Sequence, residues 1–109
     1  MDNKINSIYK GIKDLNEKIK NNGLILEKNE KILSIFFEYA IDNQNRLNIC
    51  IICKNTDSIS KIEEEIYNKF NLLKTESFNY FYKGYALDKF QTFAKNYIEI
   101  GDTIYLEKN

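Results

Sequence analysis

Two apolar stretches joined by a short polar turn constrain the fold of this 109-residue chain more than any other feature. Within residues 31–41 and 47–53, apolar side chains recur at every second position, which is typical of β-strands. Asp and Asn dominate residues 42–45 between them, and these side chains favour turns by bonding their own backbone. One face of the predicted pair carries Leu33, Ile35, Phe37, Tyr39 and Ile41 from the first stretch, and Leu47, Ile49, Ile51 and Cys53 from the second.

The opposite face of this pair is partly apolar as well. It carries Ile32, Phe36, Cys50 and Ile52, alternating with more polar or smaller positions such as Glu38. Strands that are apolar on both faces are usually covered on both sides. We therefore predict an antiparallel pair that lies centrally in a sheet.

Three segments have the alternating three- and four-residue spacing of amphipathic helices. They cover residues 3–21, residues from Asp57 or Ser58 to about Leu73, and residues 88–100, where Asp88 can cap the start. The glutamates at 63–65 fall in the first turns of the second helix, and we expect them to form a solvated face rather than a metal site. The apolar stripes are Ile5, Ile8, Ile12, Leu15 and Ile19; Ile59, Ile62, Ile66, Phe70 and Leu73; and Phe90, Phe93, Ala94 and Tyr97.

Three further strands complete the predicted architecture. They cover residues 23–27, followed by a turn at 28–30, then residues 74–83 and residues 102–107, where Ile104 and Leu106 point inward. The order is α-β-β-β-α-β-α-β. The sequence therefore predicts one α+β domain over residues 1–109, with a mixed sheet that has an N-terminal antiparallel meander and is backed by helices.

Composition argues against common enzyme chemistry. The chain has no histidine, which is the usual proton shuttle and the commonest metal ligand, and it has no complete catalytic or ligand-binding signature. Sixteen basic and sixteen acidic residues cancel, so no overall field attracts nucleic acid or an anionic membrane. No signal peptide or membrane span is evident. We expect a cytoplasmic protein without catalytic residues, metal or cofactor.

The two cysteines, Cys50 and Cys53, are spaced like a redox or zinc motif. Residues three apart in a strand point to opposite faces, and a zinc site would need two further ligands. We therefore interpret both as buried, reduced, structural thiols.

Residues 83–90 resemble the octapeptide of RNA-recognition motifs, which reads basic-Gly-aromatic-small-aromatic-aliphatic-any-aromatic. The first four positions and the last agree with it. Leu87 stands where the family has a base-stacking aromatic, and Asp88 stands where it has an aliphatic residue. The resemblance implies RNA binding, which we keep as a third hypothesis.

Residues 30–109 resemble the minimal nucleotidyltransferase domain in the order of predicted strands and helices. The functional residues of that family are missing. Glu38 and Tyr39 replace its Gly-Ser pair, and Asn48 and Cys50 replace the two carboxylates that hold Mg²⁺. The resemblance implies a catalytically dead relative that binds a nucleotide or a partner, which we keep as the alternative hypothesis.

Our first hypothesis rests on no motif, and in it the fifteen aromatic residues either fill the core or include anchors at the surface. Small proteins without a reaction centre often act by blocking a surface, and Tyr is a frequent anchor in interfaces. We expect a non-enzymatic protein that acts by contact with another protein, such as a phage or mobile-element inhibitor of a host defence system. Phe78, Tyr80 and Tyr82 share one face, and some of these rings should reach the surface. The predicted partner-binding residues are Tyr80, Tyr82, Lys83 and Tyr85.

Overall fold

The computed structural model describes residues 26–109 of the chain. These residues form an α+β fold with one five-stranded mixed sheet and one α-helix. The elements are β1 (Ile32–Ala40), β2 (Arg46–Lys54), α2 (Ile59–Phe70), β3 (Phe78–Tyr82), β4 (Tyr85–Ala86) and β5 (Thr103–Lys108).

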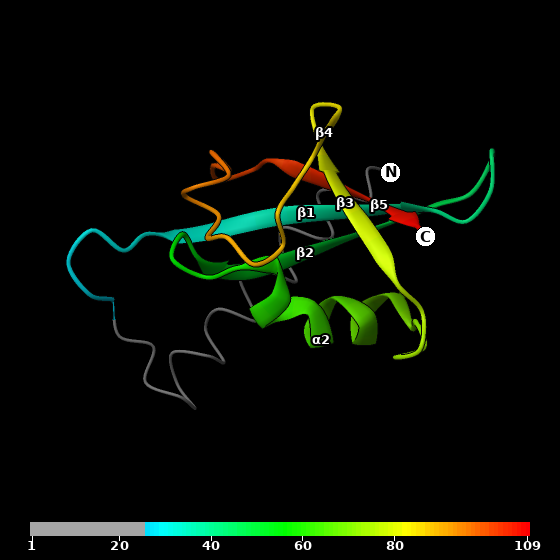
Figure 1. Ribbon diagram of the computed structural model, residues 1–109, viewed down its shortest axis with the longest axis horizontal. Helices are drawn as coiled ribbons and strands as arrows, with labels where there is room; N and C mark the ends of the chain where they lie inside the picture. Colours follow the sequence, from blue (N-terminus) through cyan, green and yellow to red (C-terminus); the bar gives the residue numbers. More distant parts are fainter. Residues whose placement is uncertain (1–25) are drawn as a thin grey trace.

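The strands lie in the order β2-β1-β5-β3-β4. Neighbouring strands are antiparallel except β1 and β5, which run parallel in the middle of the sheet. Figure 1 shows α2 lying along one face of the sheet, and β3 running at a steep angle to β1 and β5 in this view. The predicted mixed sheet is therefore confirmed, and its central pair joins strands that are far apart in the sequence.

The β1–β2 pair forms as the alternation predicts. Phe36 lies opposite Cys50, and the turn between the strands is held by the Asp42 carboxylate, which accepts bonds from the backbone N–H groups of Gln44 and Asn45, both at 2.8 Å. The face toward α2 supplies Leu33, Ile35, Phe37, Ile51 and Cys53 to the main core. The other face buries a second cluster of Phe36, Cys50 and Ile52.

Both faces of the pair are therefore apolar and buried, as expected. Two positions at the far end of the hairpin differ, because Ile41 and Leu47 lie beyond the core and are exposed. Within the described part of the chain, β2 is an edge strand rather than a central one, since only β1 pairs with it.

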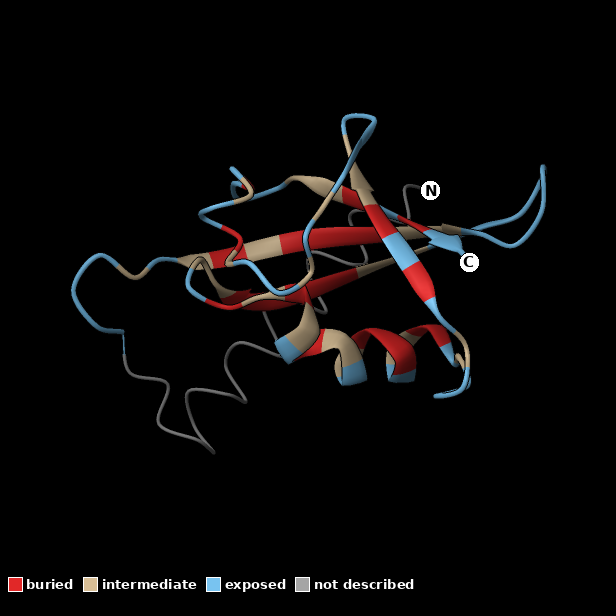
Figure 2. Cartoon of the chain, viewed as in Figure 1, coloured by how far each residue is buried: buried red, intermediate tan, exposed pale blue. Residues whose placement is uncertain are grey.

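Helix α2 begins and ends with recognisable caps. The Ser58 side chain accepts a hydrogen bond from the backbone N–H of Lys61, and Asn71 ends the helix in the left-handed conformation, with φ of 58°. Four of the five predicted stripe residues are buried, together with Tyr67, as the red side of α2 in Figure 2 illustrates. Leu73 lies past the end of the helix and is exposed.

The predicted third helix over residues 88–100 is wrong. The segment forms successive turns, and two of its backbone donors bond to the loop before α2 instead of continuing a helix. Phe93 N–H donates to the Asp57 carbonyl at 2.9 Å and Ala94 N–H to the Asn55 carbonyl at 3.0 Å. Of the predicted stripe only Phe93 is buried, while Phe90, Ala94 and Tyr97 face outward.

Several boundaries also differ from the predictions. The helix predicted over residues 3–21 and most of the strand predicted over 23–27 lie outside the described residues, and Leu26 and Glu27 are not in a strand. The predicted turn at 28–30 and the last strand are confirmed. The strand predicted over 74–83 is shorter, and β4 was not predicted.

Within residues 26–109, no helix combines the length and the apolar character that crossing a bilayer requires.

Candidate protein-binding surface

The β3–β4 hairpin carries three of the four predicted partner-binding residues. Tyr82 pairs with Tyr85 across a two-residue turn of Lys83 and Gly84, whose φ angles are 50° and 83°. Two-residue turns with positive φ at both central positions match the twist of antiparallel strands, and glycine supplies the second angle without strain. The turn holds Tyr82 and Tyr85 side by side and leaves Lys83 at the tip.

The fourth residue, Tyr80, is not part of this surface. Its ring is buried in the main core with only 2% of its area exposed, and its hydroxyl donates to Glu63 Oε2 of α2 at 2.7 Å. Burial, followed by this bond to a carboxylate, raises its pKa far above the ordinary value for tyrosine. The expectation that Tyr80 reaches the surface is wrong because α2 covers this face of β3.

The same strand shows how the faces divide. Phe78 is also buried, whereas Phe81, on the opposite face, and Tyr82 are half-buried. Of the face that should send rings to the surface, only Tyr82 is accessible. Tyr85 of β4 is far more exposed, at 76%.

Tyr82, Lys83 and Tyr85 line a hollow of about 540 Å³ between the hairpin and the segment 95–99. That segment contributes Lys95 and Tyr97. The chain thus brings together three aromatic side chains and two cations from regions that are about ten residues apart in the sequence.

Tyr97 is the most exposed of these residues, with 84% of its area accessible, and it has an unusual backbone conformation. Its φ is 59°, in the left-handed region that bulky residues rarely adopt. Tyr97 N–H donates to the Ala94 carbonyl at 3.1 Å, and Ile98 N–H donates to the Phe93 carbonyl at 2.9 Å. This pair of bonds is the Schellman motif, in which glycine usually takes the position of Tyr97.

Sequence reasoning missed Tyr97 and Lys95 as surface residues of this site. The spacing of Phe90, Phe93 and Tyr97 imitates a helix stripe, and no local residue marks the left-handed turn. A glycine at 97 would have given that signal.

The charges around the hollow favour an anion. Lys83 Nζ lies 5.2 Å from the centre of the Tyr82 ring, and a hydrogen bond to Tyr82, followed by the charges of Tyr82, Asp102 and Glu99, raises the pKa of this lysine. Within residues 26–109, neither Lys83 nor Lys95 forms a salt bridge. Glu99 is the one acidic side chain among those lining the hollow. Two cations and one carboxylate therefore line the hollow, and the Asp102 carboxylate lies near enough to Lys83 to act on its pKa as well.

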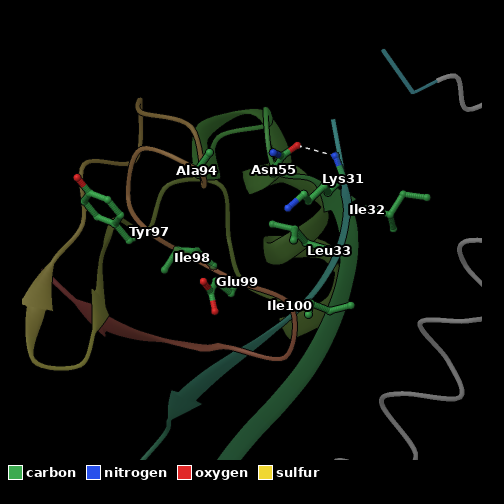
Figure 3. A pocket seen from close by; sticks show the side chains of 9 residues that line it. All are labelled: Lys31, Ile32, Leu33, Asn55, Ala94, Tyr97, Ile98, Glu99 and Ile100. Carbon is green, nitrogen blue, oxygen red and sulfur yellow. Dashed lines mark hydrogen bonds between the residues drawn. The ribbon is translucent and has the colours of Figure 1, made fainter. Parts of the chain in front are cut away.

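A second hollow of about 410 Å³ lies on the other side of the 94–100 segment. Figure 3 shows Leu33 and Ile98 lining it from opposite sides, while the ring of Tyr97 points away from it. Its wall is fixed by Asn55, whose side-chain oxygen accepts the backbone N–H of Lys31 at 2.8 Å and whose backbone carbonyl accepts that of Ala94. Tyr97 and Glu99 border both hollows, so the two form one continuous surface.

The acidic triplet of α2 is tied into the fold more than expected. Glu63 accepts from Tyr80 and from Lys89 Nζ at 3.3 Å, so it is only partly solvated, and it lies beyond the first turn of the helix. Glu64 lies 4.0 Å from Lys74, and Glu65 lies 3.6 Å from Lys69. No group of three or more metal-ligating side chains occurs between residues 26 and 109.

Cys50 and Cys53 are both buried, as predicted. Cys53 belongs to the main core and Cys50 to the cluster on the opposite face of the sheet. They therefore point to opposite sides of β2, as the three-residue spacing predicts.

The two sequence resemblances fall on ordinary structural positions. In the stretch that resembles the RNA-recognition octapeptide, Lys83 and Gly84 form the hairpin turn, and Tyr85 and Ala86 form the short strand at the sheet edge. Asn48 and Cys50, at the would-be metal positions, lie on β2, and Cys50 is packed in the second cluster.

No protein-family model and no curated protein matches the chain. Solved structures do match its fold. A de novo designed protein based on ubiquitin aligns with a TM-score of 0.59 and 18% identity, over 72% of this chain and 89% of the designed one. The ubiquitin of Caldiarchaeum subterraneum aligns with a TM-score of 0.56 and 16% identity, over 72% of this chain and 95% of its own. At these identities the likeness establishes a ubiquitin-like fold and nothing about activity.

Proposed function

We propose that this protein acts without catalysis, by binding another protein through the surface formed by Tyr82, Lys83, Tyr85, Lys95 and Tyr97, which we call the hairpin surface. The observation that carries the proposal is the placement of Tyr85 and Tyr97. Both are more than three-quarters exposed and both border one hollow. Clustered exposed aromatic residues that surround a concavity are typical of interaction sites.

The backbone at Tyr97 supports the same proposal. A left-handed aromatic residue costs free energy that the fold must supply elsewhere, and such outliers concentrate at functional sites. A contact protein of this kind can act as an inhibitor, including one carried by a phage or mobile element against a host defence system. It acts by covering a surface of its target, which requires shape and a few anchoring rings.

Purification of protein complexes with matched variants tests the proposal. Tyr85→Ala and Phe90→Ala remove rings of nearly equal exposure, 76% and 74%, but only Tyr85 lines the hollow. We expect a defined protein complex that is retained by Phe90→Ala and weakened about thirtyfold or more by Tyr85→Ala, the loss typical of an interface anchor.

Melting curves of both variants serve as the control, since both rings lie outside the core. Equal retention of the partner by the two variants would contradict the proposal. Recovery of bound RNA or nucleotide instead of a protein would favour one of the two other hypotheses.

A further inference from the structure

The second hollow, between the start of β1 and the segment 94–100, has no role in the proposed function so far. It is separated from the hairpin surface only by Tyr97 and Glu99, which border both. Its walls include Leu33, Ala94, Ile98 and Ile100, and Ile100 is 67% exposed. A volume of about 410 Å³ is ample for one large aliphatic side chain.

The two hollows differ in chemistry. The hairpin hollow offers Lys83 and Lys95, which form no salt bridge within residues 26–109, together with stacking faces of tyrosine. The second hollow has five aliphatic residues in its lining, together with Lys31, Asn55, Tyr97 and Glu99 (Figure 3). A binder that fills both must therefore present a negative charge at one end and an apolar side chain at the other.

We propose that the partner contacts this protein through an extended segment carrying an acidic side chain and a large aliphatic side chain a few residues apart. The acidic group lies in the hairpin hollow between Lys83 and Lys95, and the aliphatic side chain enters the second hollow beside Ile100. Tyr97 stands between the two and packs against the segment's backbone. This inference rests on the proposed function, because it names the kind of partner that the hairpin surface binds.

The two ends of the segment contribute to affinity in ways that depend differently on salt concentration. The charged end lies at an exposed site, so its contribution is modest and falls as salt rises above about 0.1 M, where the screening length is about 10 Å. The apolar end does not depend on salt, because it rests on removal of aliphatic surface from water. The two contributions can therefore be separated in one binding measurement.

Selection of short random peptides on the full-length chain tests the inference. Peptides are selected on the unaltered protein and counter-selected on Tyr97→Ala, which loses an exposed ring that is not part of the core. We expect the retained peptides to share an acidic and a large aliphatic residue. Their affinity should fall about three- to tenfold in the double variant K83Q/K95Q at low salt, and about tenfold in Ile100→Ser at any salt. Phe90→Ala is the matched control and should change neither.

The possible results separate the two proposals. Retained peptides without an acidic–aliphatic pattern, or with equal affinity for Ile100→Ser, would overturn the inference and leave the hairpin surface as a binding site. If no peptide distinguishes the unaltered protein from Tyr97→Ala, both the inference and the proposed function fail. Self-association of the chain that Tyr97→Ala abolishes would assign the surface to a second copy and would also overturn the inference.

Discussion

Replacement of Tyr97 by glycine should stabilise the fold relative to replacement by alanine, although it removes the same side chain. Residue 97 has a φ of 59°, in the left-handed region. A residue other than glycine in this conformation lowers the free energy of unfolding by about 1–2 kcal/mol. Glycine avoids this penalty but gains freedom in the unfolded chain, which costs about 0.5–1 kcal/mol relative to alanine. The net difference should favour Tyr97→Gly by up to about 1.5 kcal/mol.

The Tyr97 ring itself should contribute little to stability, because 84% of its area is exposed. Tyr97→Gly should therefore be at least as stable as the unaltered protein and yet bind the partner more weakly. A variant that keeps its stability but binds the partner more weakly is what we expect where a residue serves binding and not stability. Binding measured beside stability on the same samples would show it.

Urea titration of the three proteins, with thermal melting as a second probe, measures these differences. For a chain of this size, 1 kcal/mol corresponds to a shift of about 4–8 °C in Tm. Asn71, which ends α2 in the same conformation, provides an internal reference, since Asn71→Gly should likewise exceed Asn71→Ala in stability. A Tyr97→Gly variant less stable than Tyr97→Ala would refute the reasoning, because residue 97 would then not be left-handed in solution.

Three further outcomes follow from the packing and the charges. Cys50→Ser and Cys53→Ser should each lower the free energy of unfolding by about 1–3 kcal/mol, because each places a hydroxyl in an apolar cluster. Urea titration measures this loss. Partner binding should stay unchanged in both variants, and binding that depends on redox conditions would contradict the prediction. The bond from Thr56, followed by that from the Glu27 backbone, lowers the pKa of Glu30 from 4.5 to about 2. The Glu30 carboxylate therefore stabilises the fold fully above 4.5, and this contribution should disappear as pH falls toward about 2, so the difference between the unaltered protein and Glu30→Gln should vanish there. Tyr80→Phe should cost about 1.5–3 kcal/mol by removing a donor to the Glu63 carboxylate, and an unchanged free energy of unfolding would show that the bond contributes nothing.

Local pattern was sufficient to predict the hairpin and the helix that build the core. The alternation along β1 and β2 correctly assigned both faces, and of the two starts predicted for α2, Asp57 or Ser58, Ser58 is the cap. These elements are predictable because each satisfies its own backbone bonds or those of its neighbour in the sequence. The parallel pairing of β1 with β5 joins residues such as Phe36 and Thr103, and no local pattern indicates it.

The segment 88–100 shows where local reasoning fails. Its spacing is helical, but the backbone N–H groups of Phe93 and Ala94 bond to the loop that holds Asn55 and Asp57. The antiparallel bridge between Ser58 and Thr92 fixes this arrangement. A tertiary partner has replaced the helical bonds, so the side chains follow the turns rather than a stripe. Of the predicted site, Tyr82, Lys83 and Tyr85 were found from the density of aromatic residues and from an expected exposed turn, whereas the hairpin itself was not predicted. Tyr80 was misplaced because its burial depends on α2.

The change of hydrogen-bond partners in segment 88–100 also creates the candidate site. In a helix, Phe93 and Tyr97 would share one buried face and the hairpin would have no aromatic neighbour. In the observed turns, the Phe93 ring enters the core, at 0% exposure. The left-handed backbone at residue 97 turns the Tyr97 ring outward instead, to the hollow that Tyr82 and Tyr85 also line. The Ile98 N–H still donates to the Phe93 carbonyl, and both of these residues are buried in the main core. The backbone on both sides of Tyr97 is therefore anchored to the core. Because the backbone that carries the exposed rings is already fixed, binding of a partner costs little conformational entropy in this part of the chain.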